Sequence, residues 1–119
     1  MTQRSAHAQG MSDQMLAQSL FDEGRQLMAQ KRYAEACPKL AESQRLDPGG
    51  GTLTNLAICH ENEGKTGTAY LEFMAASSQA SKDGRADREA IAKEHLGRLG
   101  PRVPKLKVHV DHAVSGIGR

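Results

Sequence analysis

Apolar and small residues recur at steps of three and four along most of the chain, which is the spacing of one face of an α-helix. The clearest run is Leu16, Leu20, Gly24, Leu27 and Met28. The pattern predicts five helices, over 14–30, 33–46, 52–63, 66–81 and 85–98. The segment 47–51 (DPGGG) cannot continue a helix. Thr52 is able to cap the third helix, and Gly64 is placed to end it in the left-handed conformation. The sequence therefore predicts an all-α fold.

Two stretches of the chain carry the same pattern of small and apolar positions, 33 residues apart. The first copy holds Leu20, Ala36, Leu40 and Ser43, and the second holds Leu53, Ala69, Phe73 and Ala76. A fainter third echo places Ile91, Ala92 and His95 35 residues after Leu56, Ala57 and His60. A period of this length indicates helix–turn–helix repeats whose neighbours must stack to bury their apolar faces.

This pattern resembles the tetratricopeptide repeat, which has Trp, Leu, Gly and Tyr in its first helix, then Ala, Phe, Ala and a closing Pro. In the first copy these positions hold Leu20, Glu23, Gly24, Leu27, Ala36, Leu40, Ser43 and Pro48. Glu23 departs from the family's Leu and is expected to weaken the inner packing of the first helix. The resemblance implies an α-solenoid of two repeats over 14–100, with the charged fifth helix as a solvating cap.

The two ends of the chain differ from this helical domain. Residues 1–13 are polar and are expected to be disordered. Within them Ala6-His7-Ala8 has the small-x-small form of a signal-peptidase site, so the segment is either the remnant of a leader or an Ala-rich tail. Residues 101–119 are expected to form a linker and the start of a truncated β segment, because apolar residues alternate over 106–110. A lone strand needs a partner, so pairing between molecules stays as the alternative to truncation.

Composition narrows the function classes. The 119 residues suffice for one domain with one core, and the net charge of +2 does not favour nucleic acid as a partner. No apolar run approaches the ~20 residues of a membrane-spanning helix. Only four aromatic residues occur, so the core must be built from Leu, Ala, Ile and Met.

No constellation typical of catalysis or cofactor binding is recognisable. His109 and Asp111 would share one face of a strand and His112 the other, so binding of a metal ion by all three is awkward. The glycine-containing segment 115–118 lacks the following helix that a phosphate-binding loop requires. His60 and His95 occupy equivalent inner positions and are interpreted as packing residues. We therefore predict no enzymatic activity, no metal and no cofactor.

Cys37 and Cys59 leave two interpretations open. Free buried cysteines are common in helices, and the pair also fits a disulfide between the second and third helices. The short connection around Pro48 makes these helices antiparallel neighbours, and each cysteine lies 11 residues from Pro48. This places the two side chains next to each other.

Three segments carry a closer resemblance: 33–38 (YAEACP), 43–48 (SQRLDP) and the TLTNLA-x-C run of 52–59. Together they are similar to exported tetratricopeptide proteins of myxobacterial type, which have a leader, repeats and then a small β domain. The resemblance covers about 16–110 and implies a periplasmic, envelope or secreted setting. It identifies no ligand.

The leading hypothesis for function is a protein–protein interaction module that binds a partner protein or peptide in the concave groove lined by the first helix of each repeat. The residues at the family's lining positions are Phe21, Arg25, Met28, Thr54, Ile58 and Glu61. The Lys and Asn clamp that some members use on chaperone carboxyl tails is absent. The alternative is a structural spacer or self-association unit of a larger exported protein.

Overall fold

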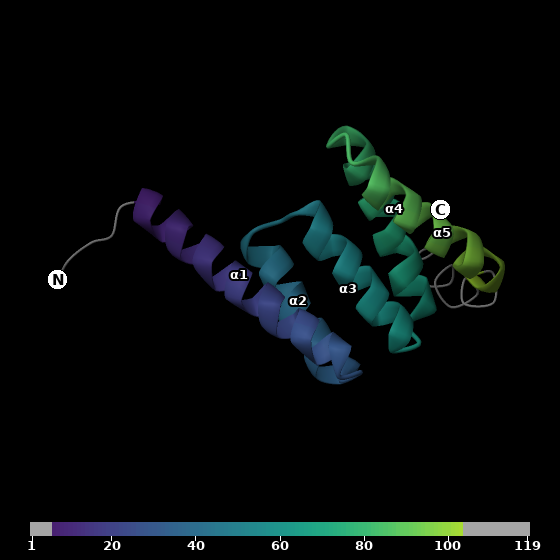
Figure 1. Cartoon of the computed structure of the whole chain (residues 1–119), viewed down its shortest axis with the longest axis horizontal. Helices are drawn as coiled ribbons and strands as arrows, with labels where there is room; N and C mark the ends of the chain where they lie inside the picture. Colours follow the sequence, from purple (N-terminus) through teal and green to yellow (C-terminus); the bar gives the residue numbers. More distant parts are fainter. Residues whose placement is uncertain (1–5, 104–119) are drawn as a thin grey trace, which may run out of the picture.

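The computed structural model describes residues 6–103, with side chains from Ser12 onward, and this part is almost entirely α-helical (Figure 1). Its elements are α1 (Ala6–Ala29), α2 (Tyr33–Leu46), α3 (Gly50–Asn62), α4 (Thr66–Lys82), α5 (Ala86–Leu99) and the short 3-10 helix η1 (Gly100–Arg102). No strand occurs within residues 6–103. The all-α prediction is confirmed, and the strand predicted at 106–110 lies outside the described residues.

Two helices begin earlier than the sequence predicts. Helix α1 starts at Ala6, so residues 6–13 are helical and the predicted disorder of this segment is wrong. The segment contains two Ala, one Gln and one Met, which favour the helix intrinsically, although Gly10 does not. Helix α3 starts at Gly50, with Gly49 at its N-cap, so Thr52 lies inside the helix and is not its cap. No side chain caps α3 at Gly49. The Gly49 amide itself donates a hydrogen bond to Gln44 Oε1 at 3.0 Å.

The turns that close α1 and α3 have the same hydrogen bonds 33 residues apart. The Arg32 amide donates to the Leu27 carbonyl, and the Lys65 amide donates to the His60 carbonyl, both at 2.9 Å. One residue earlier the backbone is left-handed, with φ of 62° at Lys31 and 82° at Gly64. Gly64 thus adopts the predicted conformation, whereas Lys31 does so at the steric cost of its Cβ. The periodicity of the sequence is therefore a periodicity of the backbone.

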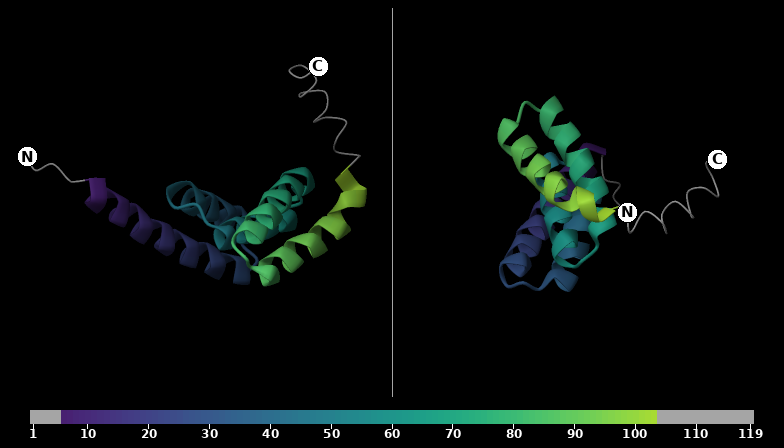
Figure 2. Two further views of the ribbon diagram at one scale, coloured as in Figure 1. Left: turned by 90° about the horizontal axis from the view of Figure 1, so that it is seen from above. Right: turned by 90° about the vertical axis from the view of Figure 1, so that its right-hand side faces the viewer.

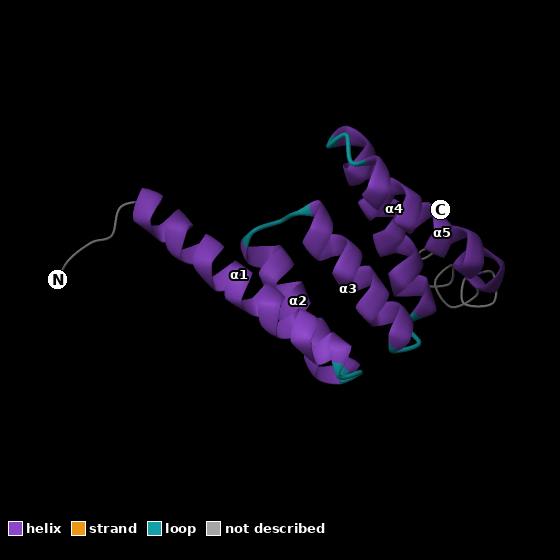
Figure 3. Ribbon diagram, viewed as in Figure 1, coloured by secondary structure: helices purple, strands orange, loops and turns teal. Residues whose placement is uncertain are grey.

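Each helix packs chiefly on the next one in the chain, and α3 lies between the pair α1–α2 and the pair α4–α5 (Figures 1 and 2). The connections are short, over 30–32, 47–49, 63–65 and 83–85 (Figure 3). The buried residues form two clusters. The first holds Ala36, Cys37, Leu40, Leu56 and Cys59. The second holds Ala57, Ala69, Phe73, Ala76, Ala92 and Leu99. Because α3 contributes to both clusters, neither helix pair buries its apolar face alone.

Helices α1 and α2 approach each other closely at Gly24. A Cβ built on Gly24 would lie 2.7 Å from Leu40 Cγ, closer than such atoms come in proteins. Three residues after Leu40 in α2, the buried Ser43 hydroxyl donates to the Ala17 carbonyl at 2.7 Å. This hydrogen bond satisfies the Ser43 hydroxyl, which stands at a position where the family pattern has Ala. The small residue at 24 and the hydroxyl at 43 together set the distance between the two helices.

Two residues of α1 lie on a different side from the predicted one. Leu16, expected on the inner face, is 51% exposed, and its neighbour Ala17 is buried in its place. Glu23, expected to disturb the inner packing, points away from the core and forms an ion pair with Lys39 of α2 at 2.9 Å. The departure from the family pattern at Glu23 is thus accommodated on the surface.

Candidate functional site

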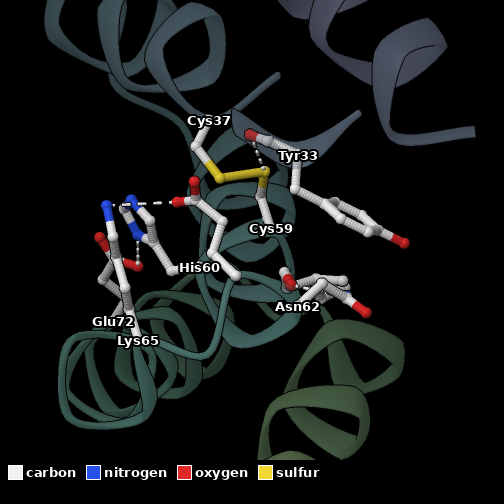
Figure 4. Close-up of polar contacts among 9 residues, drawn as sticks. Tyr33, Cys37, Cys59, His60, Asn62, Lys65 and Glu72 are labelled. Carbon is white, nitrogen blue, oxygen red and sulfur yellow. Dashed lines mark hydrogen bonds and ion pairs between the residues drawn. A yellow bond between two sulfur atoms is a disulfide. The ribbon is translucent and has the colours of Figure 1, made fainter. Parts of the chain in front are cut away.

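The strongest link between α2 and α3 is covalent. Cys37 of α2 and Cys59 of α3 form a disulfide with a Cα–Cα distance of 5.7 Å, inside the usual range of about 4.4–6.8 Å (Figure 4). Both residues are buried. Of the two interpretations that the sequence left open, the structure contains the disulfide. It ties the first repeat to the first helix of the second.

Polar residues of α3 and α4 surround this disulfide (Figure 4). His60 Nδ1 lies 2.7 Å from Glu72 Oε1, which links α3 to α4 at a site that is largely shielded from solvent. Cys59 Sγ lies 3.6 Å from the Tyr33 carbonyl oxygen. His60 therefore forms a polar contact between α3 and α4, in addition to the packing role that the sequence predicts for it.

Glu63, at the end of α3, completes this neighbourhood. Its Oε1 atom is buried and has no hydrogen-bond partner within the described part of the chain. Lys65 Nζ lies 3.3 Å from the same oxygen, close enough for electrostatic attraction but outside hydrogen-bonding geometry. A buried carboxylate oxygen without a hydrogen bond is rare, because its desolvation is left uncompensated.

A second polar cluster joins α3 to α5. Glu61 Oε1 lies 2.6 Å from His95 Nδ1, and Glu61 Oε2 accepts a hydrogen bond from Arg98 at 2.6 Å. The His95 ring also stacks on Phe73, with ring centroids 4.4 Å apart. The packing role predicted for His95 is thus present, together with a polar contact to Glu61 that the sequence analysis missed. The 35-residue spacing of His60 and His95 was its signal, since each histidine meets a glutamate of a neighbouring helix.

The charge of Glu61 is stabilised in this cluster. Burial by itself would raise the pKa of Glu61, but the hydrogen bonds from Arg98 and His95 outweigh it and lower the pKa below its usual 4.5. A carboxylate with a lowered pKa in the folded state stabilises the fold above its unfolded pKa, and this contribution is lost as the pH falls through the folded pKa.

We expect Glu61→Gln to lower the free energy of unfolding by about 1–2 kcal/mol at neutral pH, through loss of the charged hydrogen bonds to α5. The difference from wild type should shrink as the pH falls below 4.5, the usual pKa of a glutamate. Urea unfolding at a series of pH values measures both effects. Glu94→Gln, at an exposed position of α5, is the matched control and should be close to neutral. A difference that does not change with pH would contradict the ionic account.

The six predicted groove residues are not equally accessible. Phe21, Arg25 and Met28 follow one stripe of α1, and the Arg25 guanidinium carbon lies 5.7 Å from the centroid of the Phe21 ring. Phe21 and Met28 are half-buried, with one side against the first core cluster, and Arg25 is exposed. We call these three residues the α1 stripe. Its outer edge is accessible to a partner.

The three predicted residues of α3 are largely occupied within the protein. Thr54 is buried, and its hydroxyl donates to the Gly50 carbonyl at 2.8 Å, so it offers nothing to a partner. Glu61 is engaged with α5, as described above. Ile58 is half-buried and packs against the second core cluster. Of the six predicted groove residues, Arg25 is therefore the exposed one, and Phe21, Met28 and Ile58 are each half-buried against a core cluster.

No protein-family model, curated protein or solved structure matches the chain. Among the described residues, no helix combines the length and the apolar character needed to cross a membrane.

Proposed function

We propose that the chain is a protein–protein interaction module, a short tetratricopeptide-like α-solenoid that binds a segment of a partner protein. The observation that carries the proposal is the α1 stripe, in which two large apolar side chains keep an accessible edge beside an exposed arginine. The packing of each helix on the next, and the identical turns 33 residues apart, support the solenoid character. The disulfide makes the neighbouring helices a rigid support for such a surface.

The chemistry of the α1 stripe suggests the kind of segment it would bind. Phe21 and Met28 offer apolar contact, and Arg25 offers a charged donor for a carboxylate. Glu61 is neutralised by Arg98 and His95, so no free acidic group opposes Arg25 from the predicted groove residues of α3. We therefore propose a partner segment with an apolar side chain next to an acidic one.

The disulfide also supports an exported setting. Disulfides persist in the periplasm and outside the cell and are rare in the cytosol of mesophiles. A periplasmic or secreted location, which the resemblance to exported repeat proteins implied, is accordingly part of the proposal.

Self-association or a spacer role is the second candidate, and a separate observation favours it. Leu71 and Met74 of α4 are 63% and 49% exposed, and Ile91 of α5 is 41% exposed. Leu71 and Met74 are three residues apart and so lie next to each other on the outer face of α4. Sedimentation velocity distinguishes the two candidates: a concentration-dependent dimer that Leu71→Glu dissolves would favour self-association.

We expect a photo-crosslinking amino acid at position 25 to form an adduct with a defined partner in the native host, because Arg25 is the exposed member of the α1 stripe. The same amino acid at Ala90, exposed on α5, is the matched control and should give no adduct of that mass. Mass spectrometry identifies the adducts. The expected adduct should disappear when Phe21→Ser is combined with the crosslinker. Equal adducts from positions 25 and 90 would overturn the assignment of the surface.

A further inference from the structure

Three side chains that are typical zinc ligands converge beside the disulfide. One ligand atom each of Cys37, His60 and Glu63 lie within 4.8 Å of one another. The sulfur of Cys59 is bonded to that of Cys37 and therefore lies at the same place. Cys59 and His60 lie in the last turn of α3, Glu63 directly follows that helix, and Cys37 faces them from α2. Two sulfurs, one imidazole and one carboxylate thus approach one point from two rigid helices.

We propose that reduction of the Cys37–Cys59 disulfide turns this cluster into a binding site for one zinc ion, with Cys37, Cys59, His60 and Glu63 as its four ligands. Zinc prefers a tetrahedral set of sulfur, nitrogen and carboxylate donors, whereas calcium and magnesium require oxygen donors. With bonds of about 2.0–2.3 Å, neighbouring donors of such a site lie roughly 3.5 Å apart. The donors of Cys37, His60 and Glu63, within 4.8 Å of one another, must therefore close by up to about an ångström, whereas the two sulfurs, bonded to each other in the disulfide, must separate by about an ångström.

The surroundings of His60 already have the arrangement of a metal ligand. Its Nδ1 contacts Glu72 Oε1 at 2.7 Å, which leaves Nε2 as the nitrogen for the metal. Figure 4 shows the His60 ring between Glu72 on one side and the disulfide on the other. A carboxylate on the far nitrogen of a histidine fixes the ring and raises its basicity toward zinc. Glu72 is thus a positioning residue for the site.

The other two features that zinc binding would explain are at Glu63. Its buried Oε1 lacks a hydrogen bond, and a metal ion would supply the missing partner. Zinc with two thiolates and one carboxylate carries a net charge of −1, which the ammonium of Lys65, 3.3 Å from Glu63 Oε1, neutralises. Zinc, its four ligands and Lys65 together therefore carry no net charge.

The chemistry balances with a dithiol as reductant. The dithiol passes two electrons and two protons to the disulfide, whose S–S bond breaks to give two thiols, and the dithiol itself becomes a disulfide. Zinc then displaces the two thiol protons, which leave to solvent, and binds both thiolates. The two sulfurs bond either to each other or to the metal, so oxidation to the disulfide would release the zinc ion.

Zinc titration of the full chain against a competing chromophoric chelator tests the proposal. We expect one zinc per chain after reduction with a phosphine, and none in the oxidised protein. His60→Ala should weaken the affinity by at least ~10-fold, and Glu72→Gln by roughly 10–100-fold. His95→Ala is the matched control, because His95 is the equivalent histidine of the third echo and should leave the affinity unchanged. Zinc binding by the oxidised protein, or equal affinity of the wild type and His60→Ala, would overturn the proposal.

Circular dichroism covers the case in which the reduced chain loses structure. Zinc that restores the helical signal supports the site, since metal binding is then coupled to folding. Zinc that binds without restoring it would show ligation by unfolded thiols and would overturn the proposal. Cobalt binding to the reduced wild type is an independent test. We expect the absorption spectrum of a tetrahedral site with thiolate charge transfer, and the spectrum of an octahedral site would contradict the assigned ligands.

Discussion

Replacing both Cys37 and Cys59 with alanine is expected to lower the free energy of unfolding by about 3 kcal/mol. The disulfide closes a sequence separation of 22 residues, and cutting it gives the unfolded chain the conformational entropy that the closed loop denies it. Apart from the backbone connection 47–49, it is also the only covalent link between α2 and α3 within the described residues. For a domain of this size such a loss lowers the melting temperature by roughly 10–20 °C.

The measurement is thermal and urea unfolding of the wild type and the double variant, with a metal chelator present so that zinc does not contribute. A reductant should lower the melting temperature of the wild type and leave that of the double variant unchanged, which serves as the internal control. Alkylation followed by mass measurement, with and without prior reduction, counts the free thiols. Equal stability of the two proteins under oxidising conditions would contradict the constraint assigned to the disulfide.

Gly24→Leu is expected to lower the free energy of unfolding by about 1–3 kcal/mol. A Cβ at this position would lie 2.7 Å and 2.8 Å from two carbon atoms of Leu40, a side chain that is itself fully buried. Because Leu40 is fully buried and protein interiors are close-packed, we expect α1 and α2 to separate to admit the larger residue. The loss should exceed the gain in helix propensity that any residue brings when it replaces glycine.

Gly97 of α5 is the matched control for this prediction. It also lies inside a helix, but no atom stands within 4 Å of a Cβ built on it. Gly97→Leu is therefore expected to stabilise the protein by about 0.5–1 kcal/mol through helix propensity alone. Urea unfolding of the two variants should give opposite signs. The same sign for both would show that the contact between Gly24 and Leu40 does not set the helix spacing.

The sequence by itself determined the helical elements and their repetition. The three- and four-residue steps mark the helical faces, because a helix in contact with a core must repeat its apolar positions at that period. The short connection before α3 makes α2 and α3 antiparallel neighbours, and equal distances from Pro48 then place Cys37 opposite Cys59. These are local properties, or follow from local ones through a loop of known length.

Only the tertiary structure decided which sides of the helices remain open. The helical period cannot tell whether a polar face meets solvent or another helix, and so it did not separate the buried Thr54 from the exposed Arg25. The partners of Glu61 and His60 lie on α5 and α4, and their meeting depends on how far each helix is rotated about its axis. That rotation is set by the packing of whole helices around Leu40, Phe73 and their neighbours. Polar contacts between helices are a consequence of this packing, and the spacing of residues along the chain does not identify the partner of each polar group.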